Sequence, residues 1–258
     1  MAWYVIVLGC LMSGALIGFT GGVLGIGGGL LAIPLLGLIM NMDQQAAQGT
    51  ALIMVLPAVL MTVRQYNQQD KIDLKAAAAG AAGSIVCTWI GAQIALGLDP
   101  SRLRLIYTGF VLFIAIFYIV QSQWRPAAGG GPKPRRKTQD FHKGWFALIG
   151  MIAGMAGGIF GVGGSVLVVP ILTTVFRLTQ TGAQGLALTM IIPGTIVALI
   201  TYAAHGQADW LLGLPLAVGS IFLVPYGVRL AYALPEPRLK LAFACMLLVI
   251  MVLLLIKV

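Results

Sequence analysis

The feature that most constrains the fold is a glycine-rich segment that the chain contains twice. Residues 21–29 read GGVLGIGGG, and residues 157–165 read GGIFGVGGS, 136 positions later. The same offset, without a gap, pairs Pro34 with Pro170, Gln48 with Gln184, Gly49 with Gly185, Pro57 with Pro193, Tyr66 with Tyr202, Asp73 with Asp209, Gly91 with Gly227, and Arg102-Leu103 with Arg238-Leu239. Chance likeness would not hold one register over about ninety residues. We therefore predict two homologous halves, 1–123 and 144–258, joined by a linker at 124–143.

The composition requires these halves to lie in a membrane. Of the 258 residues, 59% are hydrophobic and only 9% are charged, whereas soluble domains carry about 25% charged residues. Mean hydropathy is +0.97. A soluble enzyme, a secreted disulfide scaffold, a disordered protein and a DNA-binding domain are excluded. We predict an all-α polytopic protein of the lipid bilayer. Its apolar N-terminal stretch lacks a basic signal-peptide start, so we expect it to be retained as the first span.

Each half is predicted to contain five helices. The expected ranges are 3–24, 29–41, 46–64, 72–96 and 102–123, then 142–160, 165–177, 181–203, 208–233 and 238–257. The second helix of each half has about 12 residues and is therefore about 18 Å long. That is well short of the roughly 30 Å hydrocarbon core. A hydropathy count would merge it with its neighbour and report about eight spans.

The positive charge favours an inverted arrangement of the halves. The net charge is +9, and more than half of it lies between Trp124 and Gly144. Basic loops beside apolar spans face the cytoplasm, so the charge needs no nucleic-acid partner, although the linker is also suited to contact anionic lipid. With five crossings per half, 13 of the 16 Lys and Arg residues share one face. With four crossings only ten do, so we predict an inverted repeat with a cytoplasmic linker.

Glycines occur in two patterns with different expected roles. Small residues spaced by four let helices pack closely in lipid, and these are Gly14, Gly18 and Gly22 in the first half and Gly150, Gly154 and Gly158 in the second. The denser clusters that follow are Gly25, Gly27, Gly28 and Gly29, mirrored by Gly161, Gly163, Gly164 and Ser165. Each glycine costs a helix about 1 kcal/mol relative to Ala, so we predict breaks there.

Paired breaks in two repeats indicate the substrate site of a transporter, because irregular backbone is tolerated at membrane depth only where protein buries it or it lines a cavity. The N–H groups at the starts of the short helices would bind an anion. Gln48 and Gln184 follow the short helices and are expected to donate N–H groups to the substrate; the alternative is a hydrogen bond between helices. Thr50, Thr189 and Ser165 are weaker candidates of the same kind.

Charged and nucleophilic groups are expected to lie away from the membrane interior. All seven acidic residues fall at predicted helix ends or loops, which leaves no mid-span carboxylate for a proton relay or a sodium site. No P-loop, dinucleotide-binding, HExxH or CxxC motif is present, so we expect no catalytic residue, cofactor or metal. Cys10, Cys87 and Cys245 are predicted to be buried thiols. The remaining polar groups are uncharged donors, which suit a small anion.

The doubled glycine segment, with its following proline and Q-G pair, resembles the sulfite exporter TauE/SafE family. The likeness covers the chain apart from the linker and rests on 21–29 with Pro34 and 157–165 with Pro170. It implies a bacterial inner-membrane permease for sulfite, sulfonates or related organosulfur anions. Ser165 stands where the first copy has Gly29, which adds a hydroxyl on one side and makes strictly two-fold substrate contacts doubtful.

We therefore hypothesise a secondary transporter, an exporter, that moves a small sulfur-containing oxyanion such as sulfite by alternating access. A channel for the same anions shares every motif and would be told apart by kinetics. An intramembrane enzyme lacks a nucleophile and base here. A non-transporting scaffold would use the linker as a docking arm.

Overall fold

The computed structural model describes residues 3–123 and 142–256, which form ten α-helices and no strand. The helices are α1 (Trp3–Leu24), α2 (Gly29–Ile39), α3 (Gln44–Gln69), α4 (Leu74–Leu96), α5 (Pro100–Gln123), α6 (Lys143–Phe160), α7 (Ser165–Thr174), α8 (Gln180–Ala204), α9 (Trp210–Ala233) and α10 (Glu236–Ile256). The all-helical prediction is confirmed, and each predicted helix has its counterpart. The largest difference is at the end of α3, which continues five residues past the predicted limit because its last turns are polar but still helical.

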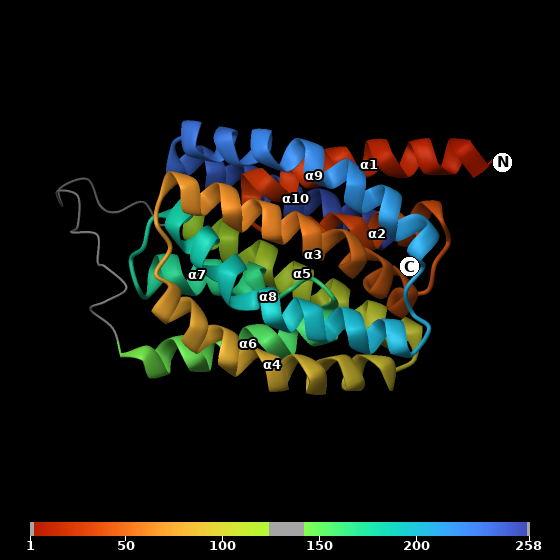
Figure 1. Ribbon diagram of the computed structural model, residues 1–258, viewed down its shortest axis with the longest axis horizontal. Coiled ribbons are helices and arrows are strands. Elements are labelled where there is room, and N and C mark those ends of the chain that lie inside the picture. Colours follow the sequence, from red (N-terminus) through yellow and green to blue (C-terminus); the bar gives the residue numbers. More distant parts are fainter. Residues whose placement is uncertain (1–2, 124–141, 257–258) are drawn as a thin grey trace.

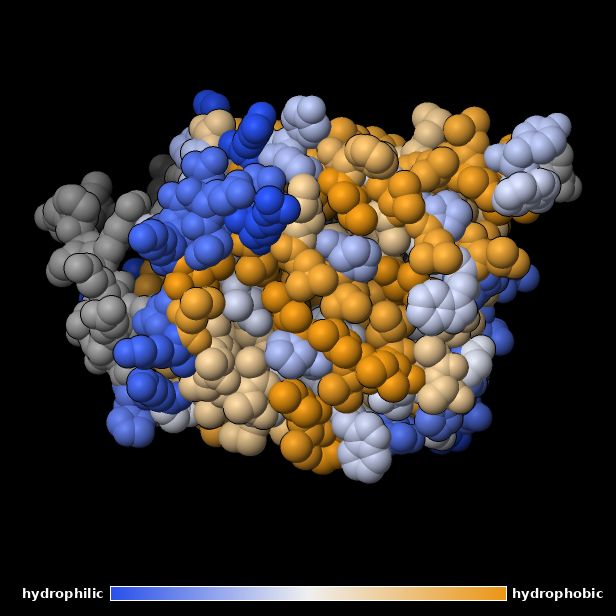
Figure 2. Space-filling model, viewed as in Figure 1, coloured by the Kyte–Doolittle hydropathy of each residue, from blue (hydrophilic) through white to orange (hydrophobic). Residues whose placement is uncertain are grey.

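Seven of the described helices are long and apolar enough to cross a membrane. Helices α2 and α7 have only 11 and 10 residues, about 16 Å at 1.5 Å per residue. Helix α10 has 21 residues, and the part of it described with its side chains includes the apolar stretch Leu241–Met251. Figure 2 shows an apolar surface across the middle of the bundle, with hydrophilic residues gathered toward its ends. The chain is a multi-pass membrane protein.

Two helix pairs, α1 with α9 and α4 with α6, pack backbone to backbone through glycines. On α1 the contacts are Gly14 with Leu216, Gly18 with Ser220 and Gly22 with Val224, and on α6 they are Gly150 with Gly80, Gly154 with Ser84 and Gly158 with Thr88. A β-carbon at any of these glycines would overlap the facing backbone. The predicted role of the glycines spaced by four is confirmed. Since the contacts advance in the same direction on both members, each pair is parallel.

The first helices of the two halves run in opposite directions. In Figure 1, α1 begins at the end marked N, whereas α6 begins at the opposite end of the bundle. An inverted repeat requires this arrangement. The repeat itself, its membrane sidedness and the boundaries of the halves stay predictions, and the basic linker lies outside the described residues except for its last two positions.

The described acidic residues all lie at helix ends. Asp73 caps α4 and Asp209 caps α9, each carboxylate accepting hydrogen bonds from two backbone N–H groups of the next turn. Both caps match the expectation that charge stays out of the span interiors. The carboxylates also satisfy amide groups that a helix start leaves unpaired.

The prediction that the three thiols are buried holds for only one of them. Cys10 is buried between helices, Cys87 is partly exposed and Cys245 is exposed. The prediction is wrong for Cys245 because an apolar run in a membrane helix has one side against protein and another on the outer surface. Position within such a run therefore does not determine burial.

Candidate functional site

Both glycine clusters break their helices where left-handed backbone is needed. Gly25, Gly27 and Gly28 have φ values of 65°, 69° and 82°, and Gly161, Gly163 and Gly164 have φ values of 67°, 76° and 72°. Residues with a β-carbon rarely adopt this conformation. The breaks therefore end α1 and α6 and start α2 and α7, as the sequence predicts.

The two breaks meet in the interior of the bundle. A β-carbon at Gly29, the first residue of α2, would lie 3.4 Å from the carbonyl oxygen of Gly161 and also contact Val55 in the middle of α3. A β-carbon at Gly163 would lie 2.8 Å from Ile191 Cδ1, in the middle of α8. Every residue of both clusters is buried. The positive ends of the two short helix dipoles therefore start close together, near the middles of α3 and α8.

Each predicted glutamine packs against the glycine loop of the other half. A β-carbon at Gly25 would lie 2.5 Å from Gln184 Cγ, and one at Gly161 would lie 2.9 Å from Gln48 Cβ. These contacts explain why both loop positions are glycine: a side chain there would collide with the amide-bearing side chain. The structure thus brings the glutamines and the loops together.

Two tyrosines that sequence reasoning did not assign to the site orient these glutamines. The Tyr66 hydroxyl donates to Gln184 Oε1 at 2.7 Å, and the Tyr202 hydroxyl donates to Gln48 Oε1 at 2.8 Å. Both tyrosines are at most 1% exposed. The sequence does pair these two tyrosines at the repeat offset of 136. Because buried hydroxyls need hydrogen-bond partners, that pairing could have indicated an equivalent partner in each half.

The amide nitrogens of the two glutamines differ. Gln184 Nε2 donates to Leu24 O at 2.8 Å, so this residue makes the helix-to-helix bond that was the alternative reading. Gln48 Nε2 and Ser165 Oγ are both buried and have no hydrogen-bond partner among the described residues. Buried polar groups are nearly always hydrogen-bonded, so these two unpaired atoms indicate a place where a ligand or water binds.

Other unpaired buried polar atoms belong to Gln44, Tyr118 and Gln180. Gln44 and Gln180 are the first residues of α3 and α8, and Tyr118 is in the last turns of α5. They therefore lie away from the helix centres where the breaks meet. Among the described residues, only Gln48 and Ser165 have an unpaired buried polar atom and also lie beside or at the end of a glycine loop.

The two predicted threonines do not offer free hydroxyls to the loops. Thr50 Oγ1 accepts a hydrogen bond from the N–H of Asp209 at 3.0 Å, at one end of the bundle. Thr189 Oγ1 donates to the carbonyl of Gly185, in its own helix, at 2.8 Å. Of the weaker candidates, Ser165 alone keeps an unpaired hydroxyl.

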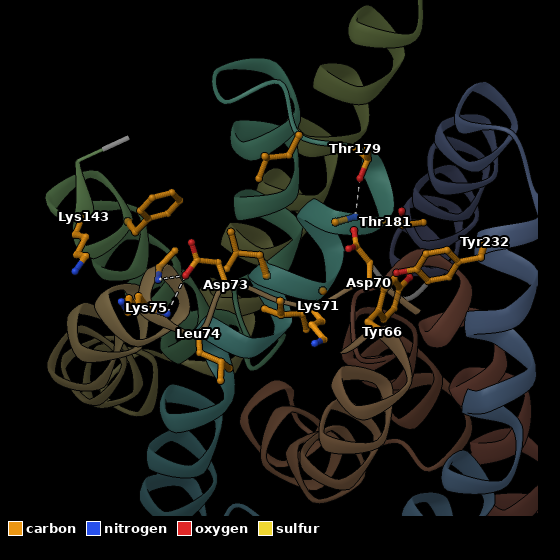
Figure 3. Close-up of a pocket in the computed structure, with 17 residues that line it drawn as sticks. Tyr66, Asp70, Lys71, Asp73, Leu74, Lys75, Lys143, Thr179, Thr181 and Tyr232 are labelled. Atoms are coloured by element: carbon orange, nitrogen blue, oxygen red, sulfur yellow. Dashed lines mark hydrogen bonds between the residues drawn. The ribbon is translucent and has the colours of Figure 1, made fainter. Parts of the chain in front are cut away.

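A cavity of about 1030 Å³ opens at the end of the bundle that carries the α3–α4 loop. It is lined from that loop and from α4, α6, α8 and α9, and Figure 3 shows its polar side chains. Tyr66 lines it and also bonds to Gln184. This tyrosine therefore stands between the cavity and the glycine loop at Gly25.

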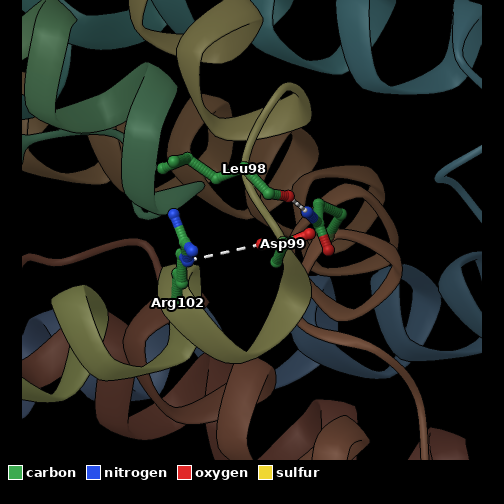
Figure 4. Close-up of polar contacts among 4 residues, drawn as sticks. Leu98, Asp99 and Arg102 are labelled. Carbon is green, nitrogen blue, oxygen red and sulfur yellow. Dashed lines mark hydrogen bonds and ion pairs between the residues drawn. The ribbon is translucent and has the colours of Figure 1, made fainter.

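The opposite end is held together by polar contacts. Gln45 Nε2 donates to Leu98 O at 2.7 Å, which ties α3 to the α4–α5 loop, where Asp99 pairs with Arg102 on the surface (Figure 4). The Thr50 hydroxyl ties α3 to the start of α9. A cavity therefore opens at one end of the bundle, and these contacts join α3 to its neighbours at the other.

Comparison with known proteins identifies the family. The sequence profile of the family described as sulfite exporter TauE/SafE matches residues 10–254. A "probable membrane transporter protein" of Xylella fastidiosa strain 9a5c is 27% identical over 210 residues, 81% of this chain and 78% of that protein. The "probable membrane transporter protein YunE" of Bacillus subtilis is 24% identical, over 81% of this chain and 82% of its own.

The likeness extends to archaea. A "probable membrane transporter protein MJ0441" of Methanocaldococcus jannaschii is 21% identical over 92% of this chain and 91% of its own. No solved structure gives a significant match. Since the family profile covers nearly the whole chain, glycine loops included, the chain belongs to the sulfite exporter TauE/SafE family of membrane proteins.

Proposed function

We propose that this chain is a secondary transporter that exports a small sulfur-containing oxyanion, such as sulfite or a sulfonate, by alternating access. The anion binds where the two glycine loops meet. The observation that carries the proposal is the pair of buried, unpaired donors, Gln48 Nε2 and Ser165 Oγ, next to the starts of two short helices. Backbone N–H groups at helix starts favour anions.

The charge distribution supports an anion over a cation. The described carboxylates are at helix ends, so none neutralises a cation at the loops. A buried anion is stabilised by several hydrogen-bond donors and by helix dipoles without a full countercharge. An export step driven by the membrane potential needs no carboxylate proton relay.

The difference between the two ends supports alternating access. The cavity reaches Tyr66 from one end, whereas Thr50 and Asp209 join helices at the other. Rocking of the two halves about the loops would exchange the open end for the closed one. A channel would instead need a continuous path to both faces.

The test is counterflow of labelled sulfite into proteoliposomes that are preloaded with unlabelled sulfite. Sulfate, thiosulfate, a sulfonate and chloride serve as competitors. Saturable exchange that one sulfur anion blocks is expected, and it separates a carrier from a channel. If the folded protein exchanges no oxyanion, the proposal is wrong.

Substitutions of loop glycines locate the site in the same assay. Gly163→Leu and Gly27→Leu should abolish exchange, because both positions have positive φ and face side chains of α8 or α3. Gly109→Leu is the matched control, since nothing lies within 4 Å of a β-carbon at that position. Normal exchange by both loop variants, with folding checked by gel filtration, would overturn the location.

A further inference from the structure

We propose that the open cavity is an anion-capture vestibule in which Lys71, Lys75 and Lys143 hold an incoming oxyanion before it enters the glycine loops. This inference rests on the proposed function and adds the side from which the anion is taken. The lysines belong to the α3–α4 loop, the first turn of α4 and the first residue of α6, and all three line the same cavity (Figure 3).

The three ammonium groups are available for a ligand. No carboxylate lies within 4.0 Å of them in the part of the chain that the structure describes. Asp70 and Asp73 also line the cavity, so three ammonium groups face two carboxylates there. The carboxylate of Asp73 accepts from the backbone N–H groups of Lys75 and Ala76 at 3.0 and 3.2 Å. Its charge is therefore directed at the start of α4. The lining therefore carries a net positive charge, and a cleft with a net charge of one sign concentrates counter-ions.

The vestibule leads directly to the proposed binding site. Its lining includes Tyr66, which is the hydrogen-bond partner of Gln184, and Gly185, which follows Gln184 in the chain. The Tyr66 hydroxyl lies 2.7 Å from Gln184 Oε1 and 3.3 Å from Gly22 O. The side chains of Tyr66 and Gln184 thus lie between this cavity and the first glycine loop.

The three lysines have no basic counterparts in the other half. The positions that the repeat offset pairs with the three lysines carry Gln207, Leu211 and Val7. The glycines, glutamines and tyrosines of the site are kept in both halves, so the loss of charge is specific to the vestibule. Capture therefore occurs at the basic end, which the positive-inside rule places in the cytoplasm, and this direction is export.

The test compares wild type with K71Q/K75Q/K143Q in proteoliposomes of uncharged zwitterionic lipid, so that lipid headgroups supply no net charge. Sulfite counterflow is measured separately from each face. At about 0.01 M salt, where the screening length is about 30 Å, the variant should show a KM about tenfold higher from the cavity face. At about 1 M salt the difference should disappear, with kcat unchanged throughout.

R102Q/R104Q is the control, because it removes two cations from the other end of the bundle. It should leave the KM from the cavity face unchanged. If the lysine variant keeps the wild-type KM, or raises the KM equally from both faces, the vestibule proposal is wrong while the transporter proposal stands. Salt-sensitive binding of labelled sulfite that the lysine variant loses, in a wild type without counterflow, would support the vestibule and refute transport.

Discussion

Ser165→Ala tests most directly whether the unpaired hydroxyl belongs to a substrate site. Ser165 is fully buried at the start of α7, and its Oγ has no partner among the described residues. The substitution removes one oxygen and breaks no hydrogen bond of the described protein. Stability and transport should therefore change in opposite directions, which a purely structural residue would not show.

The magnitudes follow from hydrogen-bond energetics. A buried polar group without a partner costs about 1–3 kcal/mol, so its removal should raise the free energy of unfolding by about 1 kcal/mol in the absence of substrate. A hydrogen bond to a charged partner contributes about 1.5–3 kcal/mol. At about 1.4 kcal/mol per factor of ten, loss of that bond should weaken anion binding about tenfold to a hundredfold.

The assay measures the KM of sulfite counterflow and the thermal unfolding midpoint of the substrate-free protein. Ser220→Ala is the matched control, because Ser220 is equally buried but donates to Ala217 O at 2.8 Å within α9. It should keep its KM and lose up to about 1 kcal/mol of stability. Ser165→Ala with a wild-type KM and no gain in stability would refute the reasoning.

Two further predictions address the packing and the closed end. Gly154→Val should destabilise the protein by about 3 kcal/mol or more, because the added atoms meet the backbone of α4. Gly109→Ala should stabilise α5 by about 1 kcal/mol, because nothing lies within 4 Å of the added β-carbon. Equal thermal midpoints of the two variants would contradict this prediction. Thr50→Val removes the acceptor of the Asp209 N–H and should speed hydrogen exchange of residues 205–210 about tenfold. Unchanged exchange would mean that this contact does not hold the end closed.

The repeat and the glycine spacing made much of the site predictable. Gly25 and Gly161 had to be breaks because the local glycine density is too costly for a helix, and the structure gives both positive φ. Glycines spaced by four had to be contacts because small residues are what close helix packing in lipid requires. Both inferences depend on local backbone chemistry, which is readable from neighbouring residues.

The different hydrogen bonding of the two glutamines was not predictable from the sequence. The sequence presents Gln48 and Gln184 as equivalent, yet Gln184 Nε2 bonds to Leu24 O while Gln48 Nε2 has no described partner. A difference of this kind arises from how the two halves are positioned against each other, which no local pattern records. The roles of Tyr66 and Tyr202 depend in the same way on contacts across the halves.

The sequence by itself determined the membrane location, the ten helices and the positions of the two breaks, because hydropathy, helix length and glycine conformation are properties of short segments. Tertiary structure alone decided that the breaks meet near the middles of α3 and α8, which end of the bundle carries the cavity, and that Lys71, Lys75 and Lys143 line it. These features join residues that are far apart in the chain, and packing between helices brings them together.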